Sequence, residues 1–160
     1  MIRVAAIALL CVALAGCGFH PLYGDSHLSP RMATIYVEPV AEATGYELRN
    51  SLIDLLGSNG VTAGKAYRLT LTVANSSQGV ALQKDATITR YNNTLTVSYV
   101  LADNKGKELT HGSLTGLSSY NVATAPYATQ SARRDADMRA LQDIAQRLSL
   151  DLAVYLNRHK

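Results

Sequence analysis

Two segments in the middle of the chain alternate strictly between apolar and polar residues. In residues 67–74 the odd positions hold Tyr, Leu, Leu and Val, and the even positions hold Arg, Thr, Thr and Ala. In residues 94–101 the odd positions hold Leu, Val, Tyr and Leu, against Thr, Thr, Ser and Val. Successive side chains of a β-strand point to opposite faces of the sheet, so each segment predicts a strand with one buried face. The chain must therefore cover one face of a sheet.

Further strands are predicted on either side of these two segments. Residues 33–40 (ATIYVEPV) are rich in β-formers and contain Pro39, which predicts a short strand near an edge. Residues 103–106 (DNKG) are a strong turn signal, so the strand before them and a fourth strand over 107–122 should form a hairpin. The polar residues 75–85 are expected to form a loop. The third strand is expected to begin early, near residue 86, with a bulge or kink at Asn92 and Asn93.

Two segments have helical spacing. Residues 44–47 (TGYE) have the spacing of a capping box, and leucines at 48, 52, 55 and 56 follow them, which predicts a helix ending at Gly57 or Gly60. Residues 126–156 contain no interior Gly or Pro, and Thr124 is the expected cap of this long amphipathic helix. The order β-α-β-β-β-α predicts an α+β, two-layer fold, in which two helices pack on one face of a four-stranded, mostly antiparallel sheet.

The first sixteen residues have the build of a secretory signal. Arg3 precedes an apolar run over residues 4–14, which is too short to cross a membrane, and small residues follow. Residues 14–17 (LAGC) match the lipobox of bacterial lipoproteins, so cleavage before Cys17 and its modification by N-acyl and S-diacylglycerol groups, palmitate among them, are expected. An ordinary signal peptide with a chance cysteine is the alternative. No other cofactor is expected.

The remaining chain predicts one domain on a tether. Removing residues 1–16 of the 160 leaves 144 residues, of which 17–31 are expected to form the lipidated tether and 32–160 the domain. Of the 15 basic residues one lies in the leader, and none of the 12 acidic residues does, so the mature net charge is about +2. The chain has no Lys/Arg run, which argues against nucleic acid as a partner.

No catalytic constellation is found in the sequence. The four histidines lack the spacing of metal ligands, no nucleophile elbow is present, and the carboxylates are scattered. An enzyme is therefore not expected, and no metal site is assigned.

The sheet face opposite the helices is expected to be polar and uncharged. It would carry the hydroxyl side chains Thr70, Thr72, Thr94, Thr96 and Ser98. An ordinary solvated face is the simpler interpretation, although such faces usually carry more Lys and Glu. A charge-poor hydroxyl surface suits a polar protein wall, such as the lumen of a β-barrel, where hydrogen bonds can form again after burial.

Several motifs resemble the alphaproteobacterial form of the LptE family of lipopolysaccharide (LPS) assembly lipoproteins. They span nearly the whole chain in the expected order: CGFHPLYG at 17–24, TRY at 89–91, SYNV at 119–122, YAT at 127–129 and RDA at 134–136. The resemblance implies a lipid-anchored protein on the periplasmic side of the cell outer membrane, since Gly18 replaces the aspartate that marks retention in the inner membrane. It also implies a 1:1 complex with an LptD-type β-barrel, which the protein would plug and help to assemble, and contact with LPS in transit.

Basic residues are the candidates for contact with the phosphates of lipid A, because charge-assisted hydrogen bonds recognise phosphate. Arg90 is the first choice because it lies in the matched TRY segment, and Lys84 is the second. Lys105 and Lys107 at the predicted hairpin turn are further candidates. Two rival classes remain open: a lipoprotein subunit of another outer-membrane assembly or lipid-trafficking machine, and an enzyme facing the periplasm.

Overall fold

A computed structural model describes residues 28–82 and 88–159, which form one four-stranded sheet and its helices. Along the chain these elements are α2 (Leu28–Ala33), β1 (Ile35–Val37), α3 (Glu42–Leu56), β2 (Tyr67–Leu82), β3 (Ile88–Asp103), β4 (Glu108–Asn121) and α4 (Pro126–Arg158). The strand order is β1-β2-β3-β4, with β1 parallel to β2 and the other pairs antiparallel. The predicted α+β class is confirmed, and the short first strand lies at an edge as expected.

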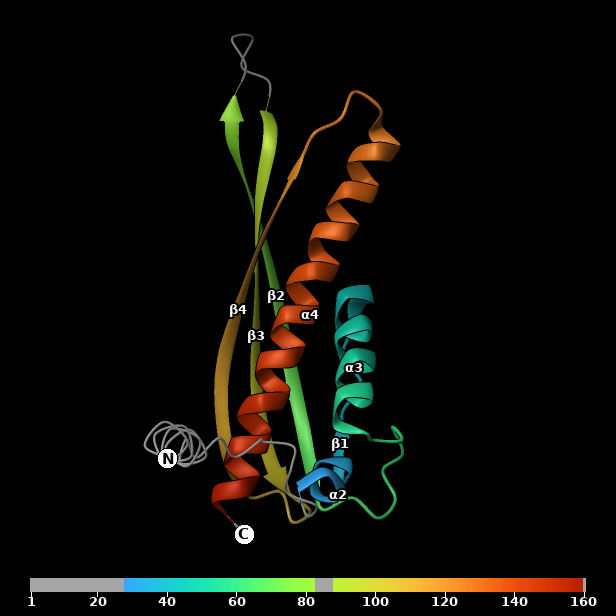
Figure 1. Ribbon diagram of the computed structural model, residues 1–160, viewed down its shortest axis with the longest axis vertical. Coiled ribbons are helices and arrows are strands. Elements are labelled where there is room, and N and C mark those ends of the chain that lie inside the picture. Colours follow the sequence, from blue (N-terminus) through green and yellow to red (C-terminus); the bar gives the residue numbers. More distant parts are fainter. Residues whose placement is uncertain (1–27, 83–87, 160) are drawn as a thin grey trace, which may run out of the picture.

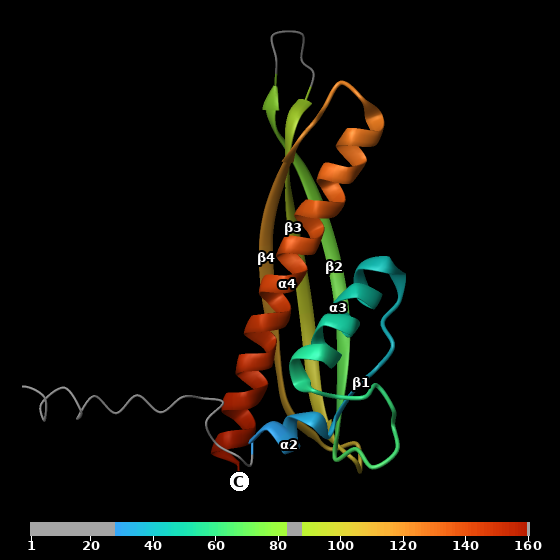
Figure 2. The same cartoon turned by 45° about the vertical axis from the view of Figure 1, so that its right-hand side comes forward.

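The molecule is elongated, with both long helices on the same face of the sheet (Figures 1 and 2). The C-terminal end of α4, α2 and the β3–β4 turn lie at one end, which we call the base. The end of β2, the start of β3 and the first turn of α4 lie at the other, which we call the distal end. Residues 103–107 form the predicted turn, in which the Asp103 amide donates to the Lys107 carbonyl and Gly106 has φ 83°.

The core lies between the helices and the odd-numbered side chains of β2 and β3. Leu69, Leu95, Val97 and Leu101 are buried there, as the alternation predicts. The amphipathic character predicted for α4 is confirmed, because one side of the helix is buried, with Tyr155 on that side partly exposed. The buried residues include Leu141, Ile144, Ala145, Leu148 and Leu152. On α3, Leu48, Leu52 and Leu56 are buried, whereas Leu55 is 41% exposed and does not join the core as its spacing suggested.

The predicted loop after residue 74 is wrong, because β2 continues to Leu82. Asn75 pairs with Leu95 and Ser77 with Asn93, so β3 extends the ladder through a segment whose composition is typical of loops. The predicted bulge at Asn92 and Asn93 is also wrong. The irregular register lies nearer the ends of the two strands, where Val80 on β2 and Thr89 on β3 have no partner in the ladder. Strand pairing, which is a tertiary interaction, overrides local composition here.

Both predicted helix caps are wrong. Helix α3 begins at Glu42 after Ala41, so Thr44 is already inside its first turn and makes no cap. The earlier start brings Val40 against Gly45, where a Cβ would overlap it. Helix α4 begins after Ala125 rather than Thr124, with Pro126 in its first turn. The predicted end of α3 is confirmed at Gly57, which has φ 63°.

Helix α2 is an element that the sequence analysis did not predict. Its Arg31 joins it by hydrogen bonds to the C-terminal end of α4 and to Tyr67 on β2. The Arg31 guanidinium donates to the carbonyl oxygens of Leu156 at 2.6 Å and His159 at 3.1 Å, and to the Tyr67 hydroxyl at 3.1 Å. It therefore caps the C-terminal end of α4. The predicted signal peptide, Cys17 and residues 17–27 of the expected tether lie outside the described residues.

Candidate functional site

The sheet face away from the helices is neutral and polar across three strands. We call it the open face and define it by five cross-strand rows, each running from β2 through β3 to β4. The rows are Thr70–Val100–His111, Thr72–Ser98–Ser113, Ala74–Thr96–Thr115, Ser76–Thr94–Leu117 and Gln78–Asn92–Ser119. None of these residues is Asp, Glu, Lys or Arg. The rows follow from the register, because residues of one parity on each strand share a face.

All five hydroxyl residues named from the sequence lie on the open face. Thr70, Thr72 and Ser98 are exposed, and Thr94 and Thr96 are half-buried. The β4 side chains, which the sequence analysis did not assign, extend the surface by a third strand. Gly112 and Gly116 alternate with them on the other face, where Cβ atoms would meet Tyr99 and α4, respectively.

Charged residues occur only at the two ends of this face. At the base, Arg68 Nη1 lies 2.8 Å from Glu38 Oε1, and the Thr70 hydroxyl donates to Glu38 Oε2 at 2.7 Å. These hydrogen bonds, first from Arg68 and then from Thr70, hold the pKa of Glu38 below its ordinary value. At the distal end, Arg90 Nη2 donates to the Ser119 hydroxyl at 2.7 Å. The neutral surface thus ends, on both sides, at charged residues that are already hydrogen-bonded: Arg68 and Glu38 at the base and Arg90 at the distal end.

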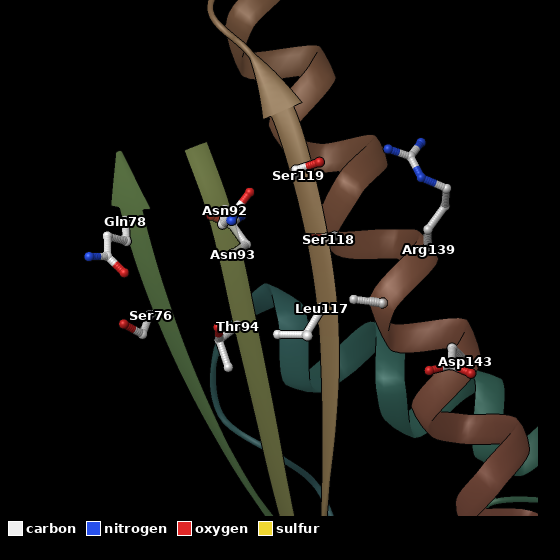
Figure 3. Close-up of a pocket in the computed structure, with 11 residues that line it drawn as sticks. Ser76, Gln78, Asn92, Asn93, Thr94, Leu117, Ser118, Ser119, Arg139 and Asp143 are labelled. Atoms are coloured by element: carbon white, nitrogen blue, oxygen red, sulfur yellow. The ribbon is translucent and has the colours of Figure 1, made fainter. Parts of the chain in front are cut away.

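A cavity of about 670 Å³ opens where the distal part of the open face meets the edge of β4 and α4 (Figure 3). Its lining combines hydroxyl and amide side chains with Arg139 and Asp143 from α4, and Leu117 beside them is 76% exposed. Asn93 is only 1% exposed, and within the described parts of the chain its Oδ1 and the Ser118 hydroxyl have no hydrogen-bond partner. The cavity therefore presents neutral polar side chains of the sheet beside one basic and one acidic side chain of α4.

The basic candidates do not form one site. Arg90 lies near the distal end of β3, whereas Lys105 and Lys107 lie in the turn at the base, about 44 Å away along the strand at ~3.4 Å per residue. The backbone amides of both lysines donate to Asp103 Oδ1, at 2.8 and 2.9 Å. Lys84 lies outside the described residues. The sequence motif alone could not show this separation.

Arg139 is a basic residue that the sequence analysis missed as a candidate. It lines a hollow of about 290 Å³ together with Arg90 and Asp135, and the hollow opens beside Ser119 and Tyr120. Helical spacing can show that Arg139 lies away from the apolar side of α4, but it cannot show that Arg139 lies near Arg90. Only the packing of α4 on β4 does so.

An apolar cleft of about 710 Å³ lies next to this hollow at the distal end. The rings of Tyr91 and Tyr120 stack at 5.5 Å within it, and Ile88 and Val122 complete its apolar lining. Arg133 stands among the lining residues. Tyr120 belongs to both cavities, so apolar and cationic lining meet at this end of the molecule.

Across residues 28–82 and 88–159, no three His, Cys, Asp or Glu side chains gather as metal ligands do. His111 is an exposed residue paired with Glu108 at 2.6 Å. None of the helices in the described ranges combines the length and apolar character needed to span a bilayer.

The fold and this surface define a small α+β protein with a neutral polar sheet face, which suits binding. Residues 32–152 match the LptE family, described as Lipopolysaccharide-assembly. The chain therefore belongs to the LptE family and is an LPS-assembly protein of the lipoprotein type. Membership in this non-enzymatic family supports the interpretation that the chain is not an enzyme. No curated protein sequence matches the chain.

Three solved structures share the fold. A Caulobacter crescentus CB15 protein described as a lipoprotein is 29% identical, with a TM-score of 0.69 over 83% of this chain and 97% of that chain. A minor lipoprotein from Acinetobacter baumannii is 23% identical, with a TM-score of 0.60 over 78% of this chain and 91% of that one. The rare lipoprotein B from Shewanella oneidensis is 15% identical, with a TM-score of 0.59 over 79% and 97%. The last two likenesses concern the fold alone.

Proposed function

We propose that this chain is the plug and assembly partner of an LptD-type β-barrel in the outer membrane. It would be anchored by acylated Cys17 on the periplasmic side and would help deliver LPS to the cell surface. The observation that carries the proposal is the open face, a three-strand surface without a charged side chain between its two ends. Hydroxyl and amide groups on such a surface can exchange water for a polar protein wall without the desolvation cost of a charge.

Lysines placed at the centre of the open face test the barrel contact. Thr72 and Thr96 belong to neighbouring rows. The double variant Thr72→Lys, Thr96→Lys should abolish co-purification of the barrel, because two ammonium groups would be buried without partners. The matched control is Gln142→Lys, Gln146→Lys, which adds the same charge on exposed positions of α4. Full retention of the barrel by the open-face variant would refute the proposal.

The distal end is the proposed contact with LPS. Its apolar cleft and its arginine-lined hollow lie side by side, which suits an amphiphile with acyl chains and phosphates. Arg90 and Arg139 would hold phosphate by charge-assisted hydrogen bonds. Lys105 and Lys107, at the base, form a separate second candidate.

Charge reversal at each end separates these two candidates. Arg90→Glu should weaken binding of purified LPS, whereas Lys105→Glu should leave it nearly unchanged. Weaker LPS binding by Lys105→Glu, with normal binding by Arg90→Glu, would assign the LPS contact to the base. Normal binding by the Arg90 variant would in either case refute the distal assignment. Affinity purification from outer membranes with identification of the recovered barrel would distinguish this role from that of another assembly machine.

A further inference from the structure

Strand β4 is a long edge of the sheet with unpaired backbone groups. Arg147 reaches the Thr115 carbonyl oxygen from outside the sheet at 2.7 Å, so the backbone of Thr115 points away from β3. In an antiparallel pair such residues alternate with those bonded to the neighbouring strand. His111, Ser113, Leu117 and Ser119 therefore also direct their N–H and C=O groups outward. Within residues 28–82 and 88–159, Arg147 is the one group hydrogen-bonded to these outward backbone N–H and C=O groups.

This edge lacks the charged residues, prolines and bulges that commonly prevent strand addition, although α4 contacts β4 through Arg147 and at Gly116. Natural edge strands carry lysines, prolines or bulges that prevent pairing with other chains. Residues 109–121 contain no Lys, Arg, Asp, Glu or Pro, and their pairing with β3 runs without a register shift from Thr110 to Asn121. At the opposite edge β1 covers β2 only from Tyr67 to Leu69, and an irregular register follows Gly79. The stretch of β2 between them is likewise uncharged, so the contact from Arg147 is what distinguishes β4.

Arg147 fills the middle of the edge with a reversible contact. Its Nη2 lies 2.7 Å from Thr115 O and 2.5 Å from Asp143 Oδ2, one helical turn away on α4. An incoming amide N–H could replace it at the carbonyl, and Arg147 would keep its ion pair with Asp143. Displacement of Arg147 by a strand therefore leaves neither the Thr115 carbonyl oxygen nor Nη2 of Arg147 without a hydrogen-bond partner.

We propose that β4 accepts an extended segment of the barrel partner, from a loop or a terminus outside its closed barrel, by β-augmentation, with Arg147 as the group that this added strand displaces. The extended form of the occupant follows from the edge, because outward donors and acceptors along a strand of regular register match the backbone of another strand. The side chains of these outward residues belong to the open face, so the added strand would continue the surface already assigned to the barrel. This inference rests on the proposed function.

Amide hydrogen exchange tests the pairing directly. The full-length chain would be exchanged alone and in complex with the co-expressed barrel, then quenched and analysed by mass spectrometry with single-residue fragmentation. We expect the amides of Ser113, Thr115 and Leu117 to exchange about 100-fold more slowly in the complex. The amides of Gly112, Leu114 and Gly116, which face β3, should be protected in both samples.

A proline variant provides an independent test. Ser113→Pro removes an outward N–H that the sheet does not use, and proline is tolerated on edge strands. Recovery of the barrel should be about tenfold lower for Ser113→Pro than for Ser113→Ala, which loses the same hydroxyl but keeps the N–H. Thermal unfolding of both variants checks the fold. If the proline variant does not fold, the hydrogen-exchange experiment on the unmodified chain is sufficient to test strand addition.

The outcomes separate this inference from the proposed function. Recovery of the barrel without new protection at 113, 115 and 117 would overturn strand addition and leave the proposed function intact. Protection of these amides in the chain alone, together with self-association, would assign the edge to a second copy and overturn the barrel as its occupant. Failure of the unmodified chain to recover any barrel would overturn both.

Discussion

Asn93 Nδ2 donates a 2.8 Å hydrogen bond to Asp137 Oδ1, and this bond joins the buried face of β3 to α4. Arg133 Nε lies 3.9 Å from the other carboxylate oxygen of Asp137. The distal half of α4 is thus held partly by polar contacts, whereas its basal half packs through leucines. The position of α4 at the cavity of the open face depends on this bond.

The substitution Asn93→Asp should destabilise the protein by about 3 kcal/mol at pH 7, because it buries a carboxylate against that of Asp137. The new carboxyl group would ionise less readily in the folded than in the unfolded state. The deficit should therefore grow as the pH rises above about 4 and disappear below it. Urea unfolding at pH 7 and pH 4 measures this, and an equal deficit at both values would contradict the account.

The guanidinium of Arg31 should contribute to stability at the base. Arg31→Ala removes hydrogen bonds to Leu156, His159 and Tyr67, and we expect a loss of about 1–3 kcal/mol in the free energy of unfolding. Arg31→Lys should not restore it, because a lysine cannot reproduce the planar fork. Arg158→Ala, at an exposed position of the same helix end, is the control and should have little effect. Equal effects of the Arg31 and Arg158 variants would argue against the cap.

A methyl group at Gly116 should force β4 and α4 apart. Its Cβ would lie 2.9 Å from Ile144 Cδ1 and 3.0 Å from the backbone oxygen of Ala140, and a helix backbone cannot move away as a side chain can. Gly116→Ala should lower the free energy of unfolding by about 1–3 kcal/mol. Ser113→Ala, on the open face of the same strand, should change it little. Thermal unfolding compares the two variants, and equal melting temperatures would contradict the close approach.

Glu38 should stabilise the fold in a pH-dependent manner. Its pKa is lowered from 4.5 mainly by the hydrogen bond from Arg68, so its contribution is present above pH 4.5 and is lost as the pH falls through the lowered pKa. Glu38→Gln should cost less than about 1 kcal/mol at pH 7, as partly exposed ion pairs do. The difference in urea midpoint between the variant and the unmodified chain should shrink as the pH falls below 4.5. A difference that stays constant with pH would show that the ion pair is not its cause.

Most of the sheet could be predicted from the sequence, because alternation over residues 67–74 and 94–101 reports directly which side chains are buried. The second half of β2 could not, since Asn75 and Ser77 join a strand only by pairing with β3. The same holds for the candidate site. Period two places Thr72 and Thr96 on one face, but only the register adds Ser113 and Leu117 to it, and only helix packing brings Arg139 to Arg90. The burial of a strand face leaves an alternating pattern in the local sequence, whereas the choice of the neighbouring strand and the position of a packed helix do not.

Site-specific photo-crosslinking in living cells tests the central claim most directly. A photoreactive phenylalanine analogue at Thr72 reports what lies against the open face, and the same analogue at Gln146 reports on the exposed side of α4. We expect an adduct with an outer-membrane β-barrel of the LptD type from position 72 and none from position 146. Absence of an adduct from position 72, or an adduct with a different protein, would contradict the assignment of this face to the barrel.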